Sequence, residues 1–142
     1  MNKKLWIGFI AVYVGWNLLD LVIHAGLLSG AYQSDEMMRV WRPDMMSKLW
    51  IFYIVSAFTS FFFTLIFSKW YKGKGIVEGI QYGVYMGLLM ATPMAYSSYA
   101  MYPIPYSLAL QWFIYGMVQY VVLGIVVSMI FGKKPADAPV AA

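Results

Sequence analysis

At 142 residues, 62% of them hydrophobic and only 11% charged, the chain is far more apolar than soluble domains, which average roughly 45–50% apolar and about 25% charged residues. A soluble fold of this size could not bury so much apolar surface, so the composition indicates an integral membrane protein. The absence of cysteine excludes disulfides and zinc–thiolate or iron–sulfur centres, and the net charge of +4 does not indicate a nucleic-acid partner, because the ten basic residues lie almost wholly at the ends of apolar runs.

The first apolar run, residues 5–28, follows a basic start and is long enough to span a bilayer with some tilt. A cleaved signal peptide is the alternative, but its apolar region would be only about 7–15 residues long. This run is longer, and it contains the polar residues Asn17, Asp20 and His24. It therefore predicts a retained membrane-spanning helix.

Three further apolar runs follow at residues 49–67, 79–101 and 107–131. Pro93 lies inside the third helix of the chain, where it removes a backbone hydrogen bond and should kink the helix. The Ala- and Pro-rich residues 135–142 have no periodicity and are expected to form a disordered cytoplasmic tail. The expected fold class is an all-α membrane protein, an antiparallel bundle of four transmembrane helices in a single domain at residues 1–134.

Orientation follows from the distribution of Lys and Arg, which are more frequent in cytoplasmic loops. One side has seven of them and the other three, Arg39, Arg42 and Lys48. The seven are Lys3, Lys4, Lys69, Lys72, Lys74, Lys133 and Lys134. Both ends are therefore expected in the cytoplasm, with the protein in the cell (inner) membrane. The lysines after the second and fourth runs, Lys69, Lys72, Lys74, Lys133 and Lys134, are expected to contact anionic lipids of the inner leaflet.

Small residues recur at every fourth position of the third run, at Gly75, Gly79, Gly83, Gly87, Ala91 and Ala95. On a helix this spacing forms a smooth groove into which another backbone can approach closely. We expect it to pack against Gly116 and Gly124 of the fourth run, and we expect alanine to be tolerated far better than leucine at Gly83 and Gly87. Contact between copies in a homo-oligomer is the alternative.

Polar residues in the first run, Tyr13, Asn17, Asp20 and His24, lie at steps of four, three and four. This spacing places them on one helix face, which predicts that they face other helices. An ionisable group inside a span costs roughly 2.5–3.5 kcal/mol, so Asp20 should face the interior and have a partner. The Asp20–His24 pair either fixes helix register or forms a ligand, proton or metal site.

Further polar side chains are expected in the same half of the bundle, at Tyr96, Tyr99, Gln111 and Gln119. Together with Asp20 and His24 they predict a small cavity open to the outer side. The preferred interpretation is a non-enzymatic protein that binds a small ligand or lipid there, or an accessory subunit of a membrane complex. The alternative is a small oligomeric proton- or ion-coupled transporter that uses Asp20 and His24.

Neither a catalytic residue nor a cofactor is predicted, because the sequence has no Ser-His-Asp order, phosphate-binding glycine loop or paired-histidine metal motif.

Methionines gather in the first connection at Met37, Met38, Met45 and Met46. Thioethers suit Cu(I), so these residues with His24 could form a copper site. Methionine also fills irregular apolar gaps, and a short interfacial helix resting on the bundle explains the same residues.

Overall fold

The computed structural model describes residues 2–133, which form helices and no strand. In chain order these are α1 (Lys3–Asp20), the π-helix η1 (Leu21–Leu27), α2 (Ser29–Tyr32), α3 (Asp35–Val40), the 3₁₀-helix η2 (Met45–Lys48), α4 (Trp50–Trp70), α5 (Ile76–Met101) and α6 (Tyr106–Phe131). The prediction of an all-α fold is therefore confirmed for this part of the chain. Lys134 and the expected tail at residues 135–142 lie outside the described residues.

In the described part of the chain, three helical stretches are long and apolar enough to cross a membrane, Lys3–Leu27, Met45–Trp70 and Tyr106–Phe131. They correspond to the first, second and fourth apolar runs of the sequence. The helix α5 is as long as α6, at 26 residues, but it is less apolar because glycines, serines, Glu78 and Gln81 dilute its hydrophobic residues. These three apolar helices suggest a membrane protein, and α5 remains helical through Pro93.

Large apolar side chains cover the outside of these helices. In α4, for example, Phe52 is 64% exposed and Phe58 is 67% exposed. A contiguous apolar surface of this kind would be unfavourable in water and is favourable against lipid.

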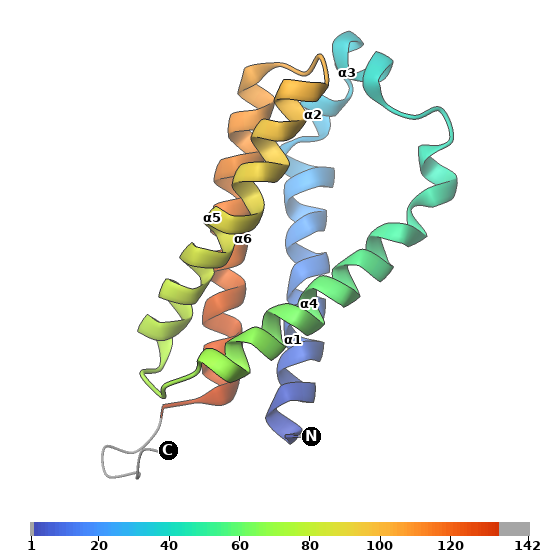
Figure 1. Ribbon diagram of the computed structural model, residues 1–142. Coiled ribbons are helices and arrows are strands. Elements are labelled where there is room, and N and C mark those ends of the chain that lie inside the picture. The colour runs from blue at the N-terminus through green and yellow to red at the C-terminus, as the bar shows by residue number, and fades with distance from the viewer. Residues whose placement is uncertain (1, 134–142) are drawn as a thin grey trace.

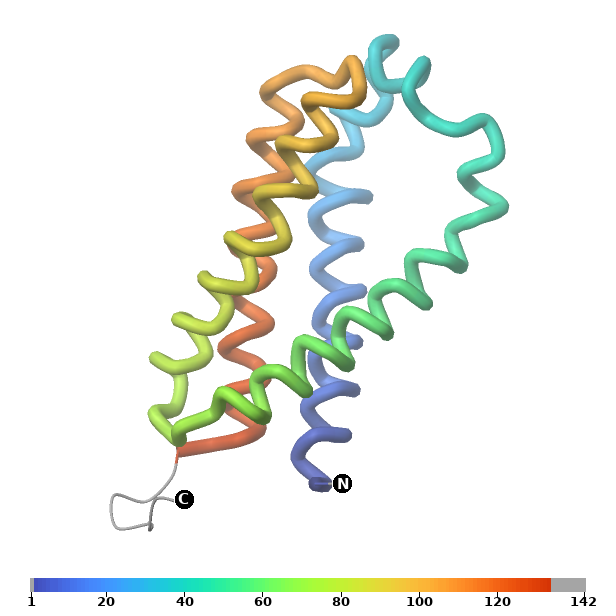
Figure 2. Tube along the Cα trace, viewed as in Figure 1, coloured from blue at the N-terminus to red at the C-terminus, as the bar shows by residue number. Residues whose placement is uncertain are grey.

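The helices are arranged around α6 (Figures 1 and 2). Antiparallel α5 packs along α6, while α1 packs on both α6 and α4. In Figure 1, α4 crosses α1 obliquely, so that its N-terminal end stands well apart from α5, with which it has little contact. The N-terminus and the end of α6 lie at the same end of the molecule.

The seam between α5 and α6 is a contact of backbones, formed at the predicted small residues. A Cβ added to Gly83 would lie 2.5 Å from the carbonyl oxygen of Tyr120 and 2.6 Å from Cα of Val121. The other glycines at the seam are Gly79, Gly87, Gly116 and Gly124, and Ala91 packs on Gly116. At Gly83 the contact leaves no room even for alanine, because a single added methyl group already collides with the backbone of α6.

At the end that holds the N-terminus, four residues form what we call the terminal joint, Lys4, Tyr71, Phe131 and Gly132. The Lys4 ammonium donates to the carbonyl of Phe131 at 2.7 Å. The Tyr71 hydroxyl lies 3.1 Å from the same carbonyl oxygen and 2.5 Å from that of Gly132. The joint thus holds the start of α1 and the end of α4 against the end of α6.

The turn between α4 and α5 is organised by Glu78, a buried carboxylate in the first turn of α5 that is only 2% exposed. Its two oxygens accept hydrogen bonds from the backbone N–H groups of Lys72 and Lys74. The turn itself needs positive φ at Gly73 and Gly75, which glycine adopts without steric cost. A carboxylate near a helix N-terminus is also favoured by the helix dipole.

Two clusters of buried apolar side chains fill the interior. We call the first, between α1, α4, α5 and α6, the central cluster: Val12, Phe63, Phe67, Tyr82, Tyr120, Leu123, Val127 and Phe131. The second, which we call the connection cluster, closes the opposite end: Ile23, Leu28, Met37, Ile104, Leu108 and Ala109. Leu19 packs against both, and the polar residues of α1 and α6 lie at this level, between the two clusters.

Candidate functional site

A cavity of about 320 Å³ lies where the two clusters meet, and we call it the Asp20 cavity. Helix α1 and the π-helix η1, together with α4, α5 and α6, contribute side chains to its wall. The polar lining residues are Asp20, His24, Ser56, Thr59 and Gln119, and the aromatic ones are Trp16, Phe52, Trp112, Tyr115 and Tyr120. Its volume is at the lower end of the roughly 300–1,000 Å³ typical of ligand pockets.

The Asp20 carboxylate is held from one side only. Its Oδ1 accepts a hydrogen bond from Nε2 of Gln119 at 2.8 Å, and Nε2 of His24 lies 4.0 Å from the same oxygen. Within residues 2–133 no group donates a hydrogen bond to Oδ2. The side chain is 35% exposed, so one carboxylate oxygen stays open to a ligand in the cavity.

A chain of hydrogen bonds fixes His24 beside this carboxylate. Nε1 of Trp112 donates to the Tyr32 hydroxyl at 2.8 Å, and that hydroxyl lies 2.6 Å from Nδ1 of His24. The rings of His24 and Tyr32 are also nearly parallel, with centroids 5.9 Å apart.

The direction of this chain follows from its donors, since an indole N–H can only donate. The Tyr32 hydroxyl therefore accepts from Trp112, which leaves its own proton available to Nδ1 of His24. In the tautomer that accepts this proton, the imidazole N–H lies on Nε2, toward Asp20. Burial raises the pKa of Tyr32 to about 12, with the Asp20 charge adding to the rise and the Trp112 hydrogen bond opposing it. The Tyr32 phenol therefore stays neutral near pH 7 and keeps a proton with which it can donate a hydrogen bond.

The π-helix η1 carries His24 and directly follows Asp20. The sequence predicts one continuous α-helix over residues 5–28, so this change of helix type is a correction. Its wider turn alters the angular position of every residue after Asp20, which spacing arguments based on an α-helix do not anticipate. Short π-helical segments occur frequently at functional sites.

Asn17 adjoins the cavity without lining it. Its amide nitrogen donates to the Tyr13 carbonyl at 2.8 Å and lies 3.3 Å from the Ser56 hydroxyl. Because Ser56 lines the cavity, this contact ties α4 to α1 at the cavity wall.

The remaining predicted site residues lie elsewhere. Tyr13 lines a shallow apolar groove between α1 and α4. The Tyr96 ring lies 6.4 Å from that of Tyr106, which also contacts Tyr99 at 5.6 Å. Of the eight predicted binding residues, the structure therefore gathers Asp20, His24 and Gln119 around one cavity, with Asn17 beside it.

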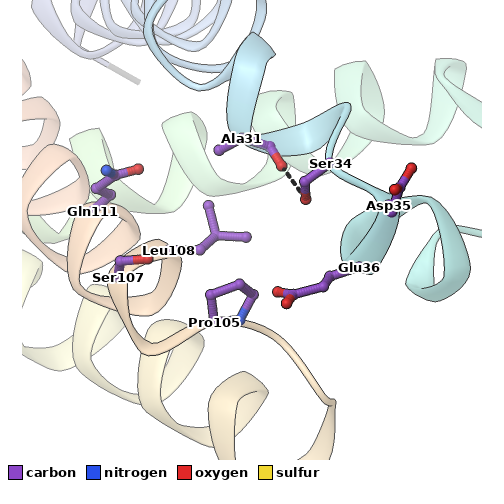
Figure 3. Close-up of a pocket in the computed structure, with 8 residues that line it drawn as sticks. All are labelled: Ala31, Ser34, Asp35, Glu36, Pro105, Ser107, Leu108 and Gln111. Carbon is purple, nitrogen blue, oxygen red and sulfur yellow. Dashed lines mark hydrogen bonds between the residues drawn. The ribbon is translucent and has the colours of Figure 1, made fainter.

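Gln111 lines a second cavity, of about 450 Å³, between the first connection and the start of α6 (Figure 3). In Figure 3 Glu36 extends toward Pro105, whereas Asp35 turns away and Gln111 lies at the opposite side. The Ser34 hydroxyl is engaged by the carbonyl of Ala31 at 2.9 Å. The polar groups here do not converge on a common point, so this cavity is a weaker candidate.

The methionines of the first connection divide between core and surface. Met37 is 1% exposed and belongs to the connection cluster, whereas Met38 and Met46 are 63% and 73% exposed. Met37 thus fills an apolar gap. Among residues 2–133 there is also no group of three or more His, Cys, Asp or Glu side chains that could hold a metal ion.

Sequence reasoning overlooked Tyr32 and Trp112, which hold His24 at the cavity, and Glu78, which organises the distant turn between α4 and α5. The aromatic pair resembles the tyrosines and tryptophans of a membrane interface, so only its contacts with His24 distinguish it. Glu78 had a usable signal, since an acidic residue in the first turn of a helix commonly caps it.

Comparisons of the chain with protein-family models, curated proteins and solved structures gave no match.

Proposed function

We propose that this chain crosses a membrane four times and binds a small ligand in the Asp20 cavity, without catalysing a reaction. The observation that carries the proposal is the Asp20 carboxylate, which Gln119 holds between helices while its second oxygen accepts no hydrogen bond from residues 2–133. A purely structural carboxylate inside a membrane would be expected to have both oxygens satisfied, because unpaired charge there is costly.

The contacts of α5 support its assignment as the fourth span. The glycines and alanines that lower its hydropathy are buried against α6, at Gly79, Gly83, Gly87, Ala91 and Ala95. Its exposed residues include Tyr85, Leu88 and Leu89, which suit lipid. Low hydropathy in this helix therefore reflects a helix–helix contact, as is usual where small residues pack in membranes.

Cysteine labelling distinguishes four spans from three, since the chain has no native cysteine. We expect Gln33→Cys and Tyr102→Cys to react with an impermeant maleimide from outside intact cells, and Lys72→Cys only after permeabilisation. The excess of lysines near Lys72 sets this orientation. Labelling of Tyr102→Cys from the same side as Lys72→Cys would mean that α5 does not cross.

Ligand binding is tested by native mass spectrometry of the full chain released from gentle detergent. We expect wild-type protein to retain a small-molecule adduct, and Asp20→Asn to lose it while melting at the same temperature or higher. The substitution keeps the shape of the side chain and removes a charge that is costly inside a membrane.

Glu36→Gln is the matched control, because it also removes one negative charge but from an exposed residue outside the Asp20 cavity. It should retain the adduct. Equal adducts in wild type and a stabilised Asp20→Asn variant would show that Asp20 only fixes the helices, and the proposed function would then be wrong.

Proton- or ion-coupled transport by an oligomer is the second candidate, and the 4.0 Å separation of Asp20 and His24 favours it. Four helices leave little room for a path through one copy, so this function requires a dimer or larger assembly. We also propose that the chain can act as an accessory subunit of a larger membrane complex. Anionic lipids of the inner leaflet would bind to the lysines after the second and fourth apolar runs, Lys69, Lys72, Lys74, Lys133 and Lys134.

A further inference from the structure

We propose that the ligand of the Asp20 cavity is an amphiphile with an ammonium headgroup, which reaches the cavity sideways from the bilayer between α4 and α5. This inference rests on the proposed function and specifies its ligand. Charge, aromatic lining, and the positions of the open and closed walls each support it.

The charge of the cavity favours a cation. Among the described residues that line it, Asp20 is the only one with a permanent charge, and no Lys or Arg is present. His24 is neutral when the Tyr32 hydroxyl, which accepts from Trp112, donates to its Nδ1. A carboxylate without a basic partner attracts a cationic ligand and repels an anionic one.

The aromatic lining favours an organic ammonium over a bare metal ion. Trp16, Trp112, Tyr115 and Tyr120 surround the same space as Asp20. The Trp16 and Tyr120 rings pack edge to face, at 85° to each other with centroids 5.3 Å apart. Ring faces combined with one carboxylate recognise ammonium groups, including alkylated ones.

The open wall of the cavity is apolar and belongs to α4 and α5. Phe52 and Val55 line the cavity from α4, Met90 and Met94 from α5, and these side chains are between 41% and 64% exposed. Here α4 diverges from α5 (Figure 2). An alkyl chain lying between these four residues would be covered by apolar atoms and would continue into lipid.

The wall toward the first and third connections is closed. The connection cluster fills that end with Leu28, Ile104 and Leu108, which are 1%, 6% and 2% exposed. The hydrogen bond from Trp112 to Tyr32 joins α6 to α2 across the same end. The cavity is therefore covered at that end, contrary to the expected opening to the outer side, and its exposed lining lies between α4 and α5.

Binding is tested by native mass spectrometry of the full chain in maltoside micelles, titrated separately with tetradecyltrimethylammonium, phosphatidylethanolamine and phosphatidylglycerol. We expect saturable 1:1 binding of at least one ammonium amphiphile, at least tenfold tighter than phosphatidylglycerol. Asp20→Asn should weaken it at least tenfold and Thr59→Trp, which fills the cavity, should abolish it, whereas Glu36→Gln should bind as wild type does. Tight binding of phosphatidylethanolamine would identify a membrane lipid, and binding of tetradecyltrimethylammonium alone a foreign organic cation.

The route is tested with an alkyltrimethylammonium that carries a diazirine at the end of its chain. We expect crosslinks to the peptides that contain Phe52 and Val55 or Met90 and Met94, and crosslinks confined to Leu28 or Ile104 would overturn the lateral route. Preference for phosphatidylglycerol, or equal ammonium binding by folded Asp20→Asn protein, would overturn the ligand class. If a cellular adduct still depends on Asp20 but no ammonium amphiphile displaces it, this inference fails and the proposed function stands.

Discussion

Replacing Gly83 by alanine is expected to destabilise the protein by about 1–3 kcal/mol, the range found for overpacked cores. The added methyl group would lie 2.5 Å from the Tyr120 carbonyl oxygen and 2.6 Å from Cα of Val121. Both atoms belong to the backbone of α6, so relief requires α5 and α6 to move apart along their seam. Unfolding in detergent, followed by circular dichroism against increasing dodecyl sulfate, measures the effect.

Gly30→Ala is the matched control, because a Cβ at Gly30 has no heavy atom within 4 Å. It makes the same chemical change in α2 and should leave the unfolding curve in place. Gly83→Leu should be worse than Gly83→Ala, since the longer side chain meets the same backbone. If Gly83→Ala and Gly30→Ala unfold at the same dodecyl sulfate concentration, α5 does not pack on α6 as described.

Loss of the Glu78 carboxylate is expected to destabilise the protein by a similar or larger amount, about 3 kcal/mol for Glu78→Ala. Hydrogen bonds to a charged group contribute about 1.5–3 kcal/mol each, and Glu78 accepts two of them, from the N–H groups of Lys72 and Lys74. The variant also leaves a cavity where a buried side chain was. Thermal unfolding in detergent, with amide hydrogen exchange at residues 71–75, provides the measurement.

Glu78→Gln should recover part of this loss, because its amide keeps one acceptor oxygen but turns an NH₂ group toward the second backbone N–H. Glu36→Ala removes an exposed acidic residue from the first turn of α3 and should change stability little. An unfolding temperature for Glu78→Ala equal to that of Glu36→Ala would contradict the role assigned to the buried carboxylate.

Local patterns were sufficient to predict the three apolar helices that are long enough to span a membrane, and the small-residue face of α5 that packs on α6. Both depend on residues close together in sequence, the first on long apolar runs and the second on a four-residue spacing. The glycine positions also predicted contact with Gly116 and Gly124, but not how close it is. A pattern of small residues shows that a neighbour approaches, whereas the intolerance of a methyl at Gly83 depends on the backbone of Tyr120 and Val121.

The candidate site was predictable at Asp20, His24 and Gln119, where ionisable or amide groups are unusual enough in apolar runs to stand out. Tyr13 was predicted in the same site but lies away from it. The reason is that α1 packs in the angle between α4 and α6, so the polar stripe of α1 is divided between these two helices. Nor could spacing predict the Tyr32–Trp112 contact, which joins residues 80 positions apart. Such contacts depend on the π-helix and on long-range packing, and neither leaves a periodic signal.

The terminal joint also sets an order of events during synthesis. The carbonyl of Phe131 receives the ammonium of Lys4, which lies 127 positions earlier in the chain. At about 5–20 residues per second, a ribosome needs roughly 6–25 s to add that many residues. Until then Lys4 and Tyr71 lack this acceptor, and the glycine face of α5 lacks the helix that covers it. Helices α1 and α4 can already pack together before α6 is made. The terminal joint forms only when α6 is complete, because Phe131 is the last residue of that helix.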